Sequence, residues 1–302
     1  MQREIKQIKE TTYVNGKDFH WGSRTYIMGI LNTSPESFSG DGITNIELAI
    51  QNGKQLVTDG ADILDIGGQS TRPPTTAEKE SAQFGTNPSP VVELSPDEEI
   101  ARVVPVIQSL SKIVSVPISI DSYKPEVVEA ALQSGATIVN DVWGLKKNPE
   151  IARITANHEA ALVLMHNQEN THYDSLLPNI IKSLEISINQ ARTMGVEQNK
   201  IIIDPGFGFG KTAAQNLALL RELNLLQVLG HPILLGTSRK GTIGYILNLP
   251  TDERVEGTAA TVAIGIANGA DMIRVHDVRE MQRVAKVADA IVRHTPESLI
   301  DP

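Results

Sequence analysis

The 302-residue chain contains no cysteine, and this absence excludes disulfides, thiolate metal sites and cysteine nucleophiles. It also has no apolar run near the roughly 20 residues that a membrane-spanning helix needs. Its start, MQREIKQIKE, has no apolar stretch like that of a secretory signal. The formal net charge of −9 argues against non-specific binding of nucleic acid, which depends on a basic surface. We therefore expect a cytoplasmic protein whose partners include neither nucleic acid nor a membrane.

Two common nucleotide-binding motifs are also absent, although the stretch IIIDPGFGFGKT at 201–212 ends like one of them. A phosphate-binding P-loop reads G-x-x-x-x-G-K-[ST] and would need a glycine at the position of Pro205. Proline has no N–H to offer a phosphate oxygen. The dinucleotide fingerprint G-x-G-x-x-G fails too, because the glycines are spaced G-x-G-x-G. What remains is an apolar strand that places the Asp204 carboxylate at the mouth of a glycine-rich turn.

Short β-branched runs alternate with segments of helical periodicity from residue 26 to residue 292. Their continuous apolar character is typical of parallel strands that are buried on both faces. Alternation counted to eight predicts an α/β fold, a single (β/α)8 TIM barrel that occupies residues 1–302 with its core at about 24–292. The expected strands are 26–32, 63–68, 117–122, 137–142, 161–166, 201–206, 232–238 and 272–277.

The segments outside the strands are less uniform. A helix is expected at 95–110, where Ser95, Pro96 and Glu98 form a capping-box pattern, and an amphipathic helix is expected at 175–194. The first 20 residues are expected to form an extra strand or ribbon across the closed end of the barrel. The Pro-rich insertion at about 73–94 has no clear periodicity, and a loop of this length is usually functional or mobile.

Polar side chains follow the expected strands at their C-terminal ends, where a barrel of this type builds its active site. Surface exposure alone would explain one or two of them. It does not readily explain carboxylates or amides after strands three, four and six together with an Arg-x-His on strand eight. We therefore interpret this end of the barrel as the functional site. Its candidate residues are Asn32, Asp121, Asn140, Asp141, His166, Asp204, Ser238, Arg274 and His276.

Seven motifs in this order resemble the dihydropteroate synthase family over about Arg24 to Val292. They are MGILNTSPESFSGDG, DIGGQSTRP, ISIDSYKPEV, IVNDV, DPGFGFGK, GTSRKGTIG and IRVHDV. The resemblance implies a (β/α)8 barrel, typically a homodimer, that joins 6-hydroxymethyl-7,8-dihydropterin diphosphate to 4-aminobenzoate. The products are 7,8-dihydropteroate and pyrophosphate, Mg²⁺ assists, and sulfonamides mimic the aminobenzoate.

A pterin presents a ring N–H beside an exocyclic amine, and this donor pair suits a carboxylate acceptor. Asp204 is the candidate acceptor, and the neighbouring Phe209 is expected to wall the pocket. The glycines then let the loop approach a flat heterocycle instead of a triphosphate. The resemblance implies four further pterin contacts, from Asp121, Asn140, Met165 and Lys240.

Arg274 and His276 are two apart on one strand and therefore share a face. By resemblance they bind the diphosphate, and a guanidinium offers a planar fork for phosphate oxygens. Asn32 resembles the family's single side-chain ligand to Mg²⁺. Asp277 is expected to cap the following helix. His166 and His172 are too isolated for a metal cluster, and a structural or surface role is expected for both.

The resemblance assigns the 4-aminobenzoate pocket to Phe38, Thr71, Arg72, Pro73, Ser238 and Gly241. This half of the site departs from the family pattern. Gln69 stands where Glu is common, Gly241 stands where Ser is common, and loop one reads ESFSGDG instead of DSFSDGG. Gly241 keeps a backbone N–H that can serve an anion at a helix N-terminus, although the serine hydroxyl is lost. The pterin half is intact.

Two alternatives remain beside a working synthase. The first is a pterin-dependent methyltransferase of the same barrel, which should lack the anion site of Lys240, Arg274 and His276. The second is a paralogue that binds dihydropterin diphosphate without condensing it.

Overall fold

The computed structural model describes residues 9–33, 42–69 and 93–293. Eight parallel strands form one sheet in the order β8-β7-β6-β5-β4-β3-β10-β9. A parallel bridge between Ile203 and Ile233 joins the first strand to the segment that precedes the last, so that the sheet closes into a barrel. The strands are β3 (Tyr26–Asn32), β4 (Ile63–Gly67), β5 (Ile118–Asp121), β6 (Ile138–Asp141), β7 (Ala161–Met165), β8 (Ile201–Asp204), β9 (Leu234–Leu235) and β10 (Met272–Val275). The predicted eight-stranded barrel is confirmed.

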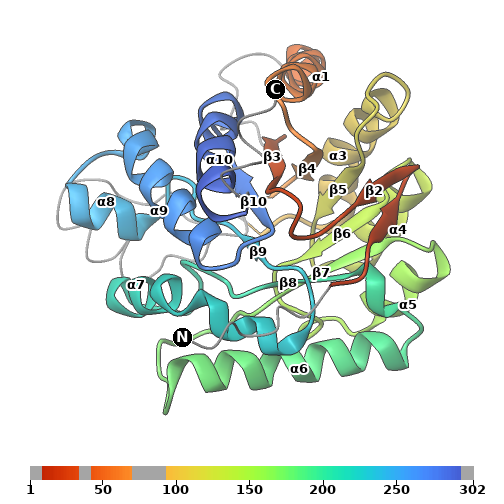
Figure 1. Cartoon of the computed structure of the whole chain (residues 1–302). Helices are drawn as coiled ribbons and strands as arrows, with labels where there is room; N and C mark the ends of the chain where they lie inside the picture. The colour runs from red at the N-terminus through yellow and green to blue at the C-terminus, as the bar shows by residue number, and fades with distance from the viewer. Residues whose placement is uncertain (1–8, 34–41, 70–92, 294–302) are drawn as a thin grey trace.

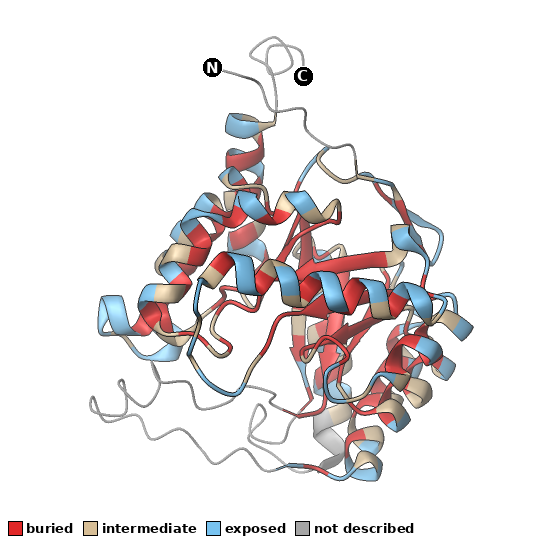
Figure 2. Ribbon diagram, turned by 90° about the horizontal axis from the view of Figure 1, so that it is seen from below, coloured by how far each residue is buried: buried red, intermediate tan, exposed pale blue. Residues whose placement is uncertain are grey.

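Helices surround the strands, as Figure 1 shows. The side of each helix that faces the sheet is buried and its outer side is exposed (Figure 2). The helices are α1 (Gly42–Thr58), α3 (Pro96–Leu110), α4 (Pro125–Gln133), α5 (Glu150–Asn157), α6 (Leu176–Thr193), α7 (Ala213–Arg221), α8 (Gly241–Leu247), α9 (Val255–Ala267) and α10 (Val278–Val292), with short 3-10 turns η3 (Gln198–Lys200), η4 (Leu223–Leu229) and η5 (Thr251–Glu253). The predicted capping box of α3 is present.

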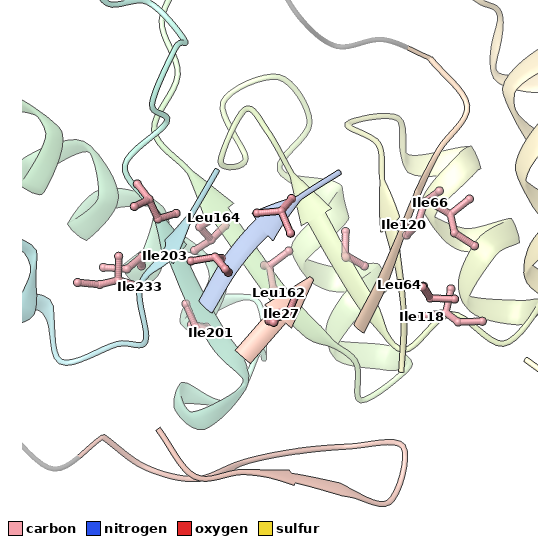
Figure 3. Packing of buried hydrophobic residues seen from close by; sticks show 14 of the residues in the cluster. Ile27, Leu64, Ile66, Ile118, Ile120, Leu162, Leu164, Ile201, Ile203 and Ile233 are labelled. Carbon is pink, nitrogen blue, oxygen red and sulfur yellow. The ribbon is translucent and has the colours of Figure 1, made fainter. Parts of the chain in front are cut away.

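The period-two alternation of the strands divides the core into two layers. One set of side chains packs between the sheet and the helices and includes Ile27, Leu64, Ile120, Leu162 and Ile203 (Figure 3). The alternate set points into the barrel and includes Met28, Ile63, Ile138, Val163 and Ile202. The interior is therefore filled by side chains, as in other barrels of eight strands.

An N-terminal hairpin of β1 (Thr12–Val14) and β2 (Lys17–Phe19) covers the N-terminal ends of the barrel strands (Figure 3). Its Phe19 ring contacts Tyr26 with the ring centroids 4.9 Å apart, and Val14 belongs to the same interior cluster. Lys9 forms an ion pair with Asp271, just before β10. For the described part of the first 20 residues, the expectation of a ribbon across the closed end is confirmed, and the opposite end is left for the site.

Candidate active site

A small polar cavity of about 70 Å³ lies at the C-terminal ends of the strands. Period-two alternation explains which side chains reach it, because residues that continue the inward-facing set beyond the apolar layer are polar. Along β10 and the residue that follows it, for example, Met272 belongs to the apolar layer, whereas Arg274 and His276 line the cavity. The full lining is Ile30, Asn32, Gln69, Asp121, Phe209, Gly236, Ser238, Lys240, Arg274 and His276.

A network of buried ion pairs and hydrogen bonds forms the floor of this cavity. Arg274 donates from Nε to Oδ2 of Asp65 at 2.6 Å and from Nη2 to Oδ2 of Asp121 at 2.7 Å. Asn140 donates from Nδ2 to the same Oδ2 of Asp65 at 3.1 Å. The Asp65 side chain is fully buried, and the Arg274 side chain is 19% exposed. One carboxylate of β4 therefore orients an amide on β6 and a guanidinium on β10.

Sequence reasoning missed Asp65, which it placed inside a strand and not at a strand end. A usable signal was present: Asp65 is an acid within the otherwise apolar run ILDIG, on the same inward face as Ile63. An acid at such a position is costly to bury unless it has a cationic partner. Arg274 provides that partner.

The electrostatics of the floor centre on Asp121. Burial raises the pKa of Asp121 to about 7, and the neighbouring Asp65 carboxylate raises it while the Arg274 guanidinium opposes that rise. Its Oδ1 atom is buried and has no hydrogen-bond partner among the described residues, as is also true of Oδ1 of Asp65. A buried acceptor without a partner is costly, so that Asp121 is suited to receive a ligand that carries a donor or a positive charge.

Asp204 ends β8 and is held by the glycine turn that follows it. Its Oδ1 accepts a hydrogen bond from the backbone N–H of Gly206 at 2.7 Å. Gly206 has a φ of +71°, and a Cβ there would lie 1.9 Å from the backbone O of His166, so that only glycine fits. Burial raises the pKa of Asp204, whereas the Gly206 N–H and the ammonium of Lys240 act in the opposite direction.

The side walls of the cavity come from the loops after β8 and β9. Phe209 is buried and packs with Met165 and Val142 in a small apolar cluster. Nζ of Lys240 lies 4.1 Å from the centroid of the Phe209 ring, a cation–π contact. The expectation that Phe209 walls the pocket is confirmed, and Lys240 is placed on the same side.

Ser238 and His276 form a pair at the rim. Oγ of Ser238 lies 2.9 Å from Nδ1 of His276 and also accepts the backbone N–H of His276 at 3.1 Å. The serine therefore fixes the orientation of the imidazole. Gly241 is the first residue of α8, so that its N–H lies at a helix N-terminus.

Three neighbouring expectations have mixed outcomes. Asp277 is the N-cap residue of α10, as predicted, but its side chain makes no cap hydrogen bond and forms an ion pair with Arg239 instead. His172 is exposed, as expected for a surface residue, whereas His166 is buried beside Lys211. The assignments to Phe38, Thr71, Arg72 and Pro73 and most of the 73–94 insertion lie outside the described residues.

Gln69, the residue that departs from the family pattern, is buried at the edge of the cavity. Its Oε1 accepts from Nζ of Lys124 at 2.9 Å and from the backbone N–H of Leu94 at 3.1 Å. Lys124 also forms a buried ion pair with Glu99 at 2.7 Å. The neutral amide thus completes a buried lysine site that already holds one carboxylate.

Residues 28–276 match the family model described as pterin binding enzyme. The chain therefore belongs to the pterin binding enzyme family. The dihydropteroate synthase of Clostridium beijerinckii is 46% identical over 282 residues, which make up 93% of this chain and 99% of the relative. That of Bacillus subtilis is 44% identical over 288 residues, 94% of this chain and 95% of the relative.

Solved structures of related proteins agree with this family assignment. A dihydropteroate synthase from Clostridium difficile, crystallised in the presence of pteroic acid, has 47% identity and a TM-score of 0.83, and the match covers 91% of this chain and all of that chain. The Xanthomonas albilineans enzyme in complex with 7,8-dihydropteroate has 35% identity and a TM-score of 0.79, over 91% of this chain and 96% of that chain. Within its family, this chain is accordingly a transferase with dihydropteroate synthase activity.

The side chains at the site determine whether a metal ion could bind there. The described ranges contain no group of three or more acidic or histidine side chains that could hold a metal by themselves. Asn32 ends β3 and is exposed at the cavity, so that its side-chain oxygen could serve as one protein ligand to a metal ion. This arrangement fits Mg²⁺, which is commonly held by few protein ligands together with substrate phosphates and water.

Among the described residues, no helix combines the length and apolar character needed to cross a membrane.

Proposed function

We propose that this cavity condenses 6-hydroxymethyl-7,8-dihydropterin diphosphate with 4-aminobenzoate. The amine nitrogen of aminobenzoate bonds to the pterin methylene, the bond from that methylene to the diphosphate oxygen breaks, and the amine loses one proton. Pyrophosphate and 7,8-dihydropteroate are released. One observation carries the proposal: carboxylate acceptors for a pterin edge, on Asp121 and Asp204, share one end of the barrel with Arg274 and His276, two groups suited to a diphosphate.

The pterin half of the reaction follows from acceptor geometry. We assign the paired N–H donors of the pterin to the Asp204 carboxylate, whose Oδ1 is already fixed by the Gly206 N–H. Asn140 and Asp121 complete the polar edge, and Met165 and Phe209 contact the ring faces. Lys240, beside the Phe209 ring, is assigned to the pterin carbonyl and ring nitrogen.

Asp121 has a second task in this account. As the diphosphate leaves, positive charge develops on the pterin, and an ionised Asp121 stabilises that charge. This stabilisation is larger in the transition state than in the bound substrate, and it therefore raises the rate of the chemical step.

The diphosphate is assigned to Arg274 and His276. Arg274 donates from Nε and Nη2 to the two floor carboxylates, and its Nη1 donates to no described residue. That nitrogen is the part of the fork that we assign to phosphate. His276, oriented by Ser238 through Nδ1, is assigned to the leaving group.

We propose that Asn32 is the side-chain ligand to Mg²⁺ and that diphosphate oxygens and water supply the remaining ligands. The ion would offset diphosphate charge and so make pyrophosphate a better leaving group. We assign the aminobenzoate to Ser238 and Gly241 at the rim together with Phe38, Thr71, Arg72 and Pro73. A Yersinia pestis dihydropteroate synthase, 34% identical, has been solved with a sulfonamide drug. Competition between sulfonamides and aminobenzoate is proposed here as well.

A cytoplasmic location is proposed from the sequence alone, and a homodimer is proposed on two grounds. The resemblance to the family suggests it, and α8, α9 and α10 pack side by side with large apolar side chains exposed on their outer surfaces. Such a patch on a single chain is typical of an interface. The exposed residues are Tyr245, Ile246, Leu247, Ile264, Val287, Ile291 and Val292. Analytical ultracentrifugation should show a dimer, and Ile264→Glu should shift it toward monomer.

The deciding experiment is pyrophosphate release from dihydropterin diphosphate and Mg²⁺ with and without 4-aminobenzoate. Release that requires aminobenzoate, with dihydropteroate formed, supports the proposal. Tight pterin binding without such release would instead favour the non-catalytic paralogue. Against the methyltransferase alternative, Lys240, Arg274 and His276 all line the one cavity.

A further inference from the structure

Lys211, the lysine of the Gly-Lys-Thr sequence, is fully buried. Its ammonium group makes three hydrogen bonds: to the backbone O of Gly206 at 2.9 Å, to the backbone O of Phe209 at 3.0 Å and to Nδ1 of His166 at 3.1 Å. An ammonium group has three donors, so that every one of them is used. Burial lowers the pKa of Lys211 to about 7, and the nearby Asp204 carboxylate opposes this shift.

The glycine spacing explains how the loop reaches around this group. Gly206, Gly208 and Gly210 have φ values of +71°, +85° and +54°, a left-handed conformation that other residues rarely adopt. Every second residue therefore turns the chain, and two carbonyl groups point at one nitrogen. A P-loop directs backbone N–H groups at an anion. This loop directs carbonyl oxygens at a cation, and the cation is a side chain of the loop itself.

The third acceptor ties the loop to the neighbouring strand. His166 follows β7, and since the ammonium donates, Nδ1 of its ring must be an acceptor. Burial and the Lys211 charge lower the pKa of His166 far below its ordinary value, so that the ring is neutral. Its ring contacts that of Tyr173, whose OH donates to the backbone O of Gly210 at 2.9 Å. The C-terminal part of the loop, at Gly210 and Lys211, is thus held against the segment after β7.

The two carbonyl groups that Lys211 binds belong to residues that build the pterin site. The N–H of Gly206 holds Oδ1 of Asp204, and the ring of Phe209 lies against Lys240. A rotation of either peptide would therefore move an acceptor or a wall of the cavity. We propose that Lys211 is a positioning residue, which acts through Gly206 and Phe209 to hold Asp204 and the aromatic wall in the geometry that binds the pterin. This proposal rests on the function proposed above.

The test compares Lys211→Met with Lys200→Met. Methionine keeps an apolar chain of similar length and removes the donors. Lys200 is a matched control because its Nζ also donates to a backbone carbonyl, that of Glu159 at 2.7 Å, but at the other end of the same strand. Hydrogen exchange by mass spectrometry reports on the loop, calorimetry with an unreactive pterin reports on binding, and steady-state kinetics report on both substrates.

For Lys211→Met we expect faster exchange in the peptide 204–212 and little change elsewhere in the barrel. The KM for dihydropterin diphosphate should rise roughly tenfold or more, because a lost hydrogen bond to a charged group is of that size. The KM for 4-aminobenzoate and kcat should change far less. In our assignment Asp204 and Phe209 contact the pterin equally in the bound substrate and in the transition state, so that their displacement weakens substrate binding more than it slows the chemical step. Lys200→Met should resemble the wild type in all three measurements.

Unchanged exchange in 204–212, or pterin affinity equal to that of the wild type, would overturn the proposal. So would an equal rise in both KM values, which indicates general destabilisation. If Lys211→Met does not fold, His166→Leu removes only the acceptor after β7, and a folded His166→Leu with normal loop exchange and pterin affinity also overturns it. The exchange and binding measurements need no turnover. If the wild type forms no dihydropteroate, the proposed function fails while the role of Lys211 is still decided.

Discussion

Arg274 on β10 and Asp65 on β4 form a buried ion pair with Nε and Oδ2 2.6 Å apart. The pair joins residues 209 positions apart in the chain, through the middle of the barrel. Because Asn140 donates to the same oxygen, Asp65 sets the position of two side chains that we assign to substrates. A residue that touches neither substrate in our assignment therefore organises both halves of the floor.

Asp65→Asn tests this arrangement. The amide keeps the shape but removes one negative charge, so that Arg274 is left with one ionised partner. We expect kcat/KM for dihydropterin diphosphate to fall by on the order of 10²-fold, as a small displacement of binding groups can cause. The pKa of Asp121 should also fall, since the Asp65 charge is one of the causes that raise it. A fall in kcat/KM without any shift of the pH profile would contradict the electrostatic part of this account.

The pH dependence of the wild type follows from the pKa of Asp121, raised to about 7 mainly by burial. If the ionised form is required, kcat/KM should rise with pH and level off above about pH 7. Asp121→Asn should be nearly inactive, and its remaining kcat/KM should not rise with pH in this range. Asp121→Glu serves as the control that retains an ionisable group.

The same group links stability to pH. The folded state holds a proton on Asp121 up to about pH 7, whereas an unfolded carboxyl loses it near its ordinary pKa of 3.8. Between these values the folded state binds more protons, so that this group makes the protein less stable as pH rises. The free energy of unfolding of Asp121→Asn, relative to wild type, should therefore increase from pH 4 to pH 7. Urea titrations at several pH values measure this difference, and a constant difference would contradict it.

Much of the barrel could be predicted from the sequence, because parallel buried strands read as apolar runs and their ends as polar residues. The prediction was least accurate for strand β9: a strand was expected at 232–238, and only Leu234–Leu235 forms one. Asp65 and Lys211 were missed for a different reason. The partner of Asp65 is on a strand far away in the sequence, and the partners of Lys211 are brought together only by the fold of its own loop and by His166. The side-chain cap expected from Asp277 is absent because Arg239, in the loop after β9, binds the Asp277 carboxylate instead.

Asp204→Asn should weaken pterin binding severely. The asparagine replaces one acceptor oxygen by a donor, which then faces the ring N–H or the amine of the pterin. We expect a loss of on the order of tenfold or more in affinity, the size of a hydrogen bond to a charged group. Calorimetry with an unreactive pterin measures it, and Asp204→Glu controls for the charge. Unchanged affinity would remove Asp204 from its assigned role.

Gly241→Ser tests the aminobenzoate half of the site. Gly241 is the first residue of α8, and its N–H lies where an anion is favoured by a helix N-terminus. A serine hydroxyl there should add a hydrogen bond to the carboxylate and lower the KM for 4-aminobenzoate several-fold, without changing the KM for the pterin substrate. A wild-type KM for aminobenzoate would show that the hydroxyl has no effect in this chain.

Lys240→Ala removes the cation that lies 4.1 Å from the Phe209 ring. Because we assign its ammonium to the pterin carbonyl and ring nitrogen, kcat/KM for dihydropterin diphosphate should fall roughly tenfold or more. Thermal stability should change little, which distinguishes this variant from a folding defect. A normal kcat/KM would refute the assignment.

The most direct test of the central claim is the release of pyrophosphate by the wild-type protein, followed with dihydropterin diphosphate and Mg²⁺ in the presence and absence of 4-aminobenzoate. Our account predicts release that depends on aminobenzoate and matches, mole for mole, the dihydropteroate formed. Pterin binding with no aminobenzoate-dependent release would contradict it.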